Sequence, residues 1–144
     1  MSRAEDAVAS FQGGFNCAQA VLSAFAPGLG LGRELALKVA GAFGGGMGRM
    51  GETCGAVTGA LMALGLRYGK YRPEDDAARD KTYDRAREFM QRFKARRGAL
   101  LCRDLLGYDI STPEGSRAVR EKGLIKTLCP GLVRDAAEML EELL

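Results

Sequence analysis

Residues 44–60 read GGGMGRMGETCGAVTGA, and this stretch constrains how the rest of the chain folds. Its first half, residues 44–51, is a glycine-rich loop that needs backbone freedom. From about Glu52 to Tyr68 the pattern becomes helical, and small residues recur every four positions on one face. Each glycine inside a helix costs about 0.5–1 kcal/mol relative to alanine, so this face predicts the close approach of a second helix or of a bound group. Its members are Gly51, Gly55, Gly59 and Ala63.

Helices are predicted on both sides of this stretch from apolar residues at spacings of three and four and from capping residues. No run of alternating β-branched residues indicates a strand. We therefore predict an all-α fold, a single-domain bundle of about seven or eight helices over residues 1–144, with the Gly-rich loop before the helix that carries Cys54. The predicted helices cover about residues 4–11, 17–25, 33–43, 52–68, 73–97 and 100–106, a segment that opens at Thr112-Pro113, and residues 130–142.

The predicted helix over residues 73–97 is long and amphipathic. Its inward stripe is expected to consist of Tyr83, Ala86, Met90 and Phe93, at spacings of three and four. Acidic and basic residues are spaced for pairing on its other face, as in Asp84 and Arg87. This pattern is typical of a solvated helix surface.

The 144-residue chain contains four cysteines but no histidine and no tryptophan. Without imidazole the protein cannot form a Ser-His or Cys-His nucleophile pair, a histidine-ligated haem or a mixed Cys/His zinc site. The remaining chemistry is that of thiolates. The cysteines can exchange disulfides, hold a metal or an iron–sulfur cluster with sulfur alone, or lie in the core as inert apolar groups.

Cys17, Cys54 and Cys129 each fall at or beside a predicted helix start. Unpaired backbone N–H groups and the helix dipole favour a thiolate there, so we expect the pKa of these thiols to lie below the ordinary value of about 8.5. Cys102 lies among leucines, which favour the neutral thiol despite the neighbouring Arg103. No CxxC motif is present, so any site that uses these sulfurs must be assembled by the tertiary fold.

The glycine loop also spells GxGxxG over residues 46–51, a pattern that binds phosphate when it joins a strand to a helix. Here the preceding segment is predicted as a helix, and the acidic residue expected about 20 positions later is missing. We therefore interpret the glycines as letting the backbone pass close to the sulfurs and donate N–H groups to them. The positions concerned are Gly45, Gly46, Gly48, Gly51 and Gly55.

Charge and hydropathy narrow the expected partners and location. The net charge is +3, and the basic excess between Arg67 and Arg103 is interleaved with acids, so we expect no nucleic-acid binding. No apolar run of about 18 residues and no secretory signal are evident, so we expect no membrane insertion and a cytoplasmic location. The redox partner cannot be read from the sequence. A homodimer fits the small-residue face, but internal packing fits it equally well.

The residues described above resemble those of the C_GCAxxG_C_C family of redox-active proteins, which is defined by four cysteines and a glycine-containing motif. The resemblance covers essentially the whole chain. It rests on FNCAQAVL at residues 15–22, on the stretch 44–60, and on Cys102 and Cys129. The central motif of this chain reads CGAxxG from Cys54 to Gly59, where the family label reads GCAxxG.

The resemblance implies redox activity through the cysteines. A related domain in split-Soret cytochromes is associated with an iron–sulfur cluster, which suggests that Cys17, Cys54, Cys102 and Cys129 bind a cluster or another thiophilic metal. The haem of those proteins does not carry over, because the chain has no CxxCH.

Two other functions remain open from the sequence. The first is a thiol–disulfide oxidoreductase, with Cys54 as the attacking thiolate and Cys17 as a second catalytic thiol. The four cysteines then allow three pairings. The second is a non-catalytic helical interaction module whose Gly/Ala face packs a partner.

Overall fold

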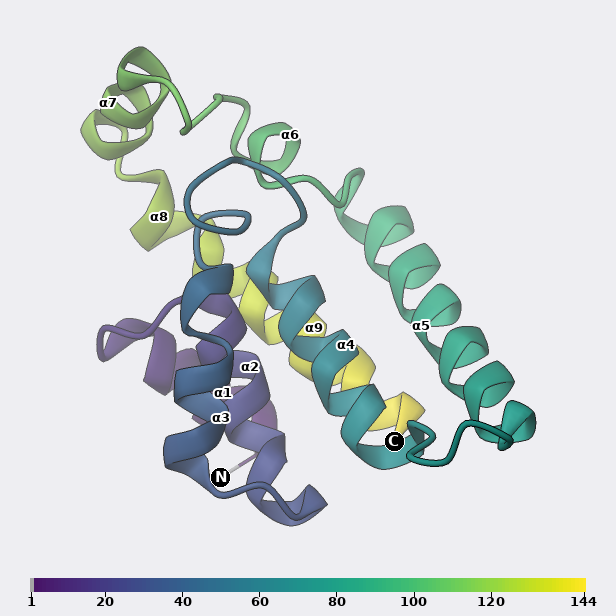
Figure 1. Ribbon diagram of the computed structural model, residues 1–144. Helices are drawn as coiled ribbons and strands as arrows, with labels where there is room; N and C mark the ends of the chain where they lie inside the picture. Colours follow the sequence, from purple (N-terminus) through teal and green to yellow (C-terminus); the bar gives the residue numbers. More distant parts are fainter. Residues whose placement is uncertain (1) are drawn as a thin grey trace.

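The computed structural model describes residues 2–144, and within that range the chain is helical with no strand. The all-α prediction is therefore confirmed. Figure 1 shows the arrangement of the elements. The helices are α1 (Arg3–Gln12), α2 (Cys17–Phe25), α3 (Arg33–Val39), α4 (Gly55–Tyr68), α5 (Asp76–Arg97), α6 (Cys102–Leu106), α7 (Pro113–Glu121), α8 (Leu124–Thr127) and α9 (Cys129–Leu143), with 3-10 helices η1 (Ala26–Leu29) and η2 (Gly41–Phe43).

Local sequence signals fix several helix starts. Asn16 caps α2 by accepting a hydrogen bond from the N–H of Gln19, whose side chain accepts in turn from the N–H of Asn16. This reciprocal capping box satisfies two backbone donors at once. Thr112 caps α7, and Pro113 occupies its first turn, where the missing N–H has no cost. Both starts were predicted from the sequence and are confirmed.

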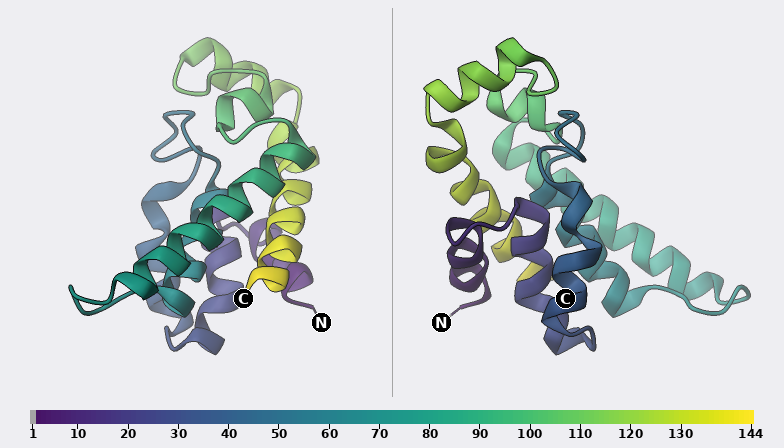
Figure 2. Two further views of the ribbon diagram at one scale, coloured as in Figure 1. Left: turned by 90° about the vertical axis from the view of Figure 1, so that its right-hand side faces the viewer. Right: turned by 60° about the vertical axis from the view of Figure 1, so that its left-hand side comes forward.

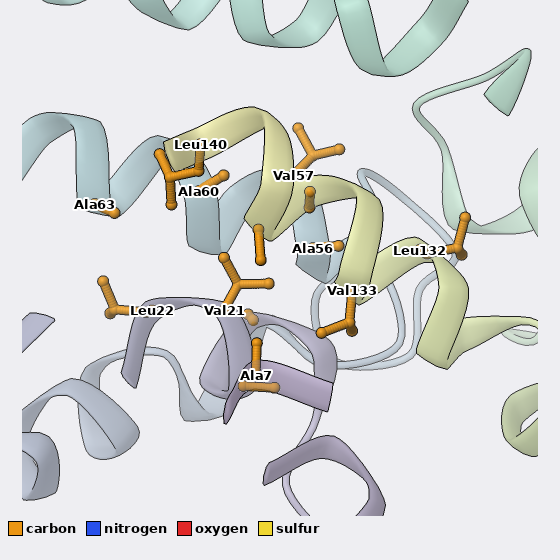
Figure 3. Packing of buried hydrophobic residues seen from close by; sticks show 14 of the residues in the cluster. Ala7, Val21, Leu22, Ala56, Val57, Ala60, Ala63, Leu132, Val133 and Leu140 are labelled. Atoms are coloured by element: carbon orange, nitrogen blue, oxygen red, sulfur yellow. The ribbon is translucent and has the colours of Figure 1, made fainter. Parts of the chain in front are cut away.

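The core is formed mainly by α1, α2, α4 and α9. In Figure 3, Val21 of α2 points toward side chains of α4 and α9, Leu22 lies on the side of Ala63 of α4, and Ala7 of α1 closes the group. On the inward face of α9, Val133 and Leu140 are fully buried. The long helix α5 packs against α4 and α9 from outside this group.

The close helix approach predicted from the small-residue face is confirmed and is internal to the chain. A Cβ atom added at Gly59 of α4 would lie 2.7 Å from the carbonyl oxygen of Ala18 in α2, and one added at Gly55 would lie 2.9 Å from the Ala18 nitrogen. Real side chains never come so close to backbone. Because α2 fills this face, the glycines supply no argument for a second copy of the chain. Homodimer formation stays a prediction.

One expected apolar face and one expected helix end were wrong. Tyr83 of α5 is 56% exposed, whereas Phe89, which we did not assign to the inward stripe, is fully buried and stacks with Phe93. The predicted helix over residues 33–43 ends at Val39 and continues as the 3-10 helix η2. Its residue Leu35 lies 60% exposed. In both cases periodicity identified a helix, but it did not determine which side faces the core or where the helix ends.

The charged face of α5 is solvated and internally paired, as expected. Asp84 pairs with Arg87, and Glu88 pairs with Arg92 at 2.6 Å. None of the helices within residues 2–144 combines the length and the hydrophobicity needed to cross a bilayer.

Candidate functional site: four cysteines around one cavity

All four cysteines lie at the first turn of a helix. Cys17, Cys102 and Cys129 are the first residues of α2, α6 and α9, and Cys54 is the N-cap of α4. The prediction is confirmed for three of them, and Cys102 shares the same placement. The Gly-rich loop and the segment from α6 to α8 lie at the same end of the molecule in both views of Figure 2. The beginnings of α2, α4 and α9 face this end, whereas α5 ends there (Figure 1).

A short antiparallel pairing joins the segments that carry Cys54 and Cys102. The N–H of Cys54 donates to the carbonyl of Leu100 at 2.8 Å, and the N–H of Cys102 donates to the carbonyl of Glu52 at 2.6 Å. Thr53 and Leu101 form the bridge between them. This pairing brings together two cysteines that are far apart in the sequence.

The contact between α2 and α4 brings Cys17 to the same place. A Cβ atom at Gly55, the residue after Cys54, would lie 3.1 Å from the Cβ of Cys17. The absence of a side chain at Gly55 therefore lets the two helix starts approach. Cys129 is the first residue of α9, and α9 packs on both α2 and α4, which brings Cys129 to the same place.

The four cysteines line one cavity of about 1060 Å³. The charge on each sulfur acts on the pKa of another in every pairwise combination, so all four share one electrostatic environment. Cys54 and Cys129 are buried, at 3% and 5% exposed, while Cys17 and Cys102 are half-buried. All four are free thiols. The fold thus assembles the sulfurs in one site.

The acid–base properties of the thiols differ from the sequence prediction. Burial raises the pKa of Cys54 to about 11, although the N–H of Ala56 in the first turn of α4 acts in the opposite direction. Burial likewise raises the pKa of Cys102 to about 12, which agrees with the expected neutral thiol. The helix start alone therefore does not make Cys54 a thiolate at neutral pH, because the loss of water outweighs the backbone donors.

Cys17 and Cys129 form a pair with opposite shifts. Hydrogen bonding to Cys129 and burial raise the pKa of Cys17 well above its ordinary value. Hydrogen bonding from Cys17 lowers the pKa of Cys129, against the opposing effect of burial. The expected lowering is thus wrong for Cys17 and Cys54 and confirmed for Cys129. The thiol of Cys17 acts as donor, and Cys129 is the sulfur that ionises most readily.

Of the five glycines proposed to surround the sulfurs, Gly45, Gly46, Gly48 and Gly55 line the cavity. Gly51 does not line it, and an added Cβ there would meet the side chains of Arg103 and Asp109 instead.

Gly46 lies beside Cys102 in the fold. An added Cβ there would lie 2.8 Å from the Cβ of Cys102 and 2.6 Å from the nitrogen of Glu52. The backbone donors that act on Cys54 belong to Ala56 and Val57 of α4. The glycines therefore provide space beside the cysteines, as predicted. The donation of their N–H groups to the sulfurs stays a prediction.

The glycine loop has an unusual backbone. Five consecutive residues, 45–49, have φ between 60° and 69°, and two of them, Met47 and Arg49, carry side chains. Each non-glycine residue in this region costs roughly 1–2 kcal/mol. The loop follows the 3-10 helix η2 rather than a strand, so the context for dinucleotide binding is missing, as the sequence indicated.

Sulfur is the only ligand type that the four cysteines supply at this cavity. Across residues 2–144, no three His, Cys, Asp or Glu side chains are placed to hold one metal ion. Four sulfurs around a single zinc would be only about 3.8 Å apart, given Zn–S bonds of about 2.3 Å in a tetrahedron. A cluster spreads its four thiolate ligands over separate irons. The four thiols that border the cavity are the ligand type that such a cluster requires.

Sequence reasoning missed the cationic part of the cavity wall. Arg49, Arg120 and Lys126 line the cavity with the cysteines, and no Asp or Glu is found among its lining residues, all of which lie in the described part of the chain. Arg120 and Lys126 belong to α7 and α8, which carry no cysteine. No local pattern in residues 113–127 indicates that they approach the sulfurs, because that proximity depends on how α7 folds back over the cavity.

The sequence was compared with known families, curated proteins and solved structures. Residues 15–143 match the model of the family described as "Putative redox-active protein (C_GCAxxG_C_C)". The match includes all four cysteines and the glycine loop. No curated protein and no solved structure shows detectable similarity to the chain.

Proposed function

This chain belongs to the C_GCAxxG_C_C family of redox-active proteins, and we propose that it transfers electrons through an iron–sulfur cluster held by Cys17, Cys54, Cys102 and Cys129. One observation carries the proposal: four thiols from four different helices line a single cavity and interact in every pair. Thiolates are the ligands of such clusters, and the chain offers no histidine in their place.

The surrounding residues suit an anionic group at this position. The beginnings of α2, α4 and α9 turn the positive ends of their dipoles toward the sulfurs, which favours the four thiolates when they are ligated. When bound, a cluster would supply a site for one-electron transfer. The chain's own part is to hold the four sulfurs, to exclude bulk water through the burial of Cys54 and Cys129, and to release the thiol protons on loading.

A reducing compartment such as the cytoplasm would keep these thiols available for ligation. The relation to the domain of split-Soret cytochromes stays a prediction, as does the existence of a redox partner.

Anaerobic reconstitution with ferrous iron and sulfide tests the cluster. We expect visible absorbance, with iron and acid-labile sulfide bound in equal amounts, and loss of both in each of the four single Cys→Ser variants. Gly65→Ala is the matched control, since an added Cβ there meets nothing within 4 Å. A colourless, metal-free protein with four reactive thiols after reconstitution would contradict the proposal.

A second candidate function is thiol–disulfide exchange by the pair Cys17 and Cys129. It is favoured by the interaction of the two thiols, which lowers the pKa of Cys129 and raises that of Cys17. The Cys129 thiolate would attack a substrate disulfide and form a mixed disulfide, releasing one substrate thiolate. Cys17 would then lose its proton and attack Cys129, releasing the second substrate thiolate, so that one disulfide is reduced and one forms in the protein. The structure thus favours Cys129 as attacking sulfur, whereas the sequence suggested Cys54.

Mass mapping separates the two functions. If exchange is the function, the oxidised protein contains a Cys17–Cys129 disulfide, and Cys129→Ser abolishes reduction of a small aromatic disulfide while Cys54→Ser retains it. If Cys54→Ser and Cys129→Ser lose exchange to the same extent, the assignment of Cys129 fails.

A further inference from the structure

We propose that the cavity beside the four sulfurs binds a small organic anion, whose charged group is held by Arg49, Arg120 and Lys126 and whose apolar part packs on the cavity wall. The inference deepens the proposed function: the ligand's role at a redox site rests on that function, whereas its binding rests on the cavity alone.

The size of the cavity indicates a ligand beyond the cluster. Pockets that bind small molecules usually have volumes of about 300–1,000 Å³, and this one has about 1060 Å³. A four-iron cluster would fill only a small part of that volume. Enough space remains for an organic molecule next to the sulfurs.

The charge of the lining side chains determines the sign of the ligand's charge. Its three cations come from separate elements: Arg49 from the glycine loop, Arg120 from α7 and Lys126 from α8. Within residues 2–144, none of the three forms an ion pair with a carboxylate, whereas many other basic residues of the chain do. Because the lining contains no acid to balance them, these cations favour a carboxylate or a phosphate.

Arg49 adds an independent observation. Arg49 has a φ of 62°, a backbone conformation in which a glycine would be less strained. The neighbouring Gly48 has nearly the same φ, 60°. The side chain of Arg49 lies over Gly45, since an added Cβ at Gly45 would be 2.7 Å from the Cγ of Arg49 and 3.2 Å from Ile110. A strained arginine at the rim of a cavity is consistent with a binding role.

The apolar side chains of the cavity wall indicate that the uncharged part of the ligand is a hydrocarbon group. Aromatic and aliphatic side chains make up most of the lining that is not glycine or cysteine, and they extend from the end of α1 to α9. Flat or branched hydrocarbon groups pack well on such a wall, and a fully hydrated inorganic ion would leave it uncovered. The main contributors are Phe11, Phe15, Leu105, Ile110, Val119 and Ile125.

Phenyl phosphate is a suitable probe, because it combines a dianion with an aromatic body, and benzyl alcohol is its neutral counterpart. Calorimetric titration of the full chain should detect phenyl phosphate and give at least tenfold weaker binding of benzyl alcohol. Amide shifts in nitrogen-15 spectra of the metal-free, reduced protein should fall on residues 41–49 and 116–126. Shifts confined to other surfaces would overturn the inference.

Two variants test the cations. The double variant Arg120→Met/Lys126→Met should weaken phenyl phosphate binding at least tenfold, with helical circular dichroism unchanged because both side chains are exposed. Arg117→Met on the same helix α7 is the matched control, since Arg117 is exposed and does not line the cavity. Equal weakening in the control and in the double variant, or unchanged affinity in the double variant, would overturn the inference.

The same titrations on reconstituted protein separate this inference from the proposed function. Iron and sulfide loading without phenyl phosphate binding would refute the anion site and leave the cluster. Phenyl phosphate binding by a chain that never loads iron would refute the cluster and leave the anion site.

Discussion

Cys17 and Cys129 each begin a helix, yet their thiols are shifted in opposite directions. Hydrogen bonding between them raises the pKa of Cys17 and lowers that of Cys129. The helix dipole acts on both, so the difference arises from their contact and not from the helix position. At the scale of single residues, the site therefore contains one sulfur that ionises readily and three that hold their protons.

A thiolate titration tests this asymmetry. In the metal-free, reduced protein, absorbance at about 240 nm should show one thiol ionising below pH 9, ahead of the others. Cys129→Ser should remove that first step. Cys17→Ala should raise the pKa of Cys129 because the donor is lost, whereas Cys17→Ser should largely keep it low, because serine also donates. A first step that survives in Cys129→Ser would contradict the assignment.

The raised pKa of Cys54 predicts a pH dependence of stability in the metal-free protein. Below pH 9 the thiol is protonated in both the folded and the unfolded chain. Above it the unfolded chain loses this proton first, because the folded pKa is about 11, so the free energy of unfolding falls as pH rises.

Between pH 8 and 11 the loss from this group should reach about 2–3 kcal/mol. Urea unfolding across that range should show a shallower decline in Cys54→Ala than in the natural sequence. Parallel declines in the two proteins would show that the thiol is not shifted.

The residue-scale comparison shows what the sequence could and could not predict. Helix starts are encoded locally, by Asn16 before Cys17 and by Pro130 after Cys129, so the placement of the cysteines could be predicted. The pKa of Cys54 could not, because it depends on burial by other elements.

At the scale of elements, the crossing of α2 and α4 fixes the distance between their cysteines. Gly55 and Gly59 face Ala18 without intervening side chains. This contact was predictable from the four-residue spacing of glycines in residues 51–63, since a helix tolerates such a cost only where close packing compensates for it. The sequence could not identify α2 as the neighbour. The spacing was equally compatible with a second copy of the chain.

Gly59→Ala should therefore destabilise the protein by about 1–3 kcal/mol, because the new methyl group would meet the backbone of Ala18. The methyl group of Gly65→Ala lies about 1.7 turns further along α4 and meets nothing within 4 Å. This substitution should stabilise the protein by about 0.5–1 kcal/mol. Thermal unfolding of the two variants measures the difference. Similar shifts of the same sign would contradict the close crossing.

A buried ion pair attaches α5 to α9. Asp135 of α9 is 6% exposed and lies 2.5 Å from Arg97 and 3.4 Å from Arg96. Arg97→Met should lower the free energy of unfolding by about 3 kcal/mol, because the buried carboxylate of Asp135 would keep only its longer ion pair with Arg96.

The matched control is Arg87→Met, which breaks an exposed pair with Asp84 on the same helix and should cost less than about 1 kcal/mol. Urea unfolding measures both variants. Equal losses would mean that the Asp135 pair contributes no more than a surface pair.

At the scale of the whole molecule, the cysteines and the basic residues around them lie at one end of the bundle. The four cysteines, five glycines of the 44–60 stretch and three cations line the same cavity. The convergence of the sulfurs was expected from the sequence because no CxxC motif could form a local site. The cationic wall was not expected, since α7 and α8 reach the cavity only through the folded path of the chain after α6. Composition gives the sign of the net charge, but it does not show where the basic side chains lie in the folded protein.

The central claim is that these four sulfurs act together as the ligands of one multi-iron site. Iron K-edge X-ray absorption of the anaerobically reconstituted protein tests it most directly, because it reports the atoms bound to iron and the presence of neighbouring iron. We predict a first shell of sulfur alone and a second shell of iron. A first shell that contains oxygen or nitrogen, without an iron neighbour, would show loosely bound metal and contradict the account.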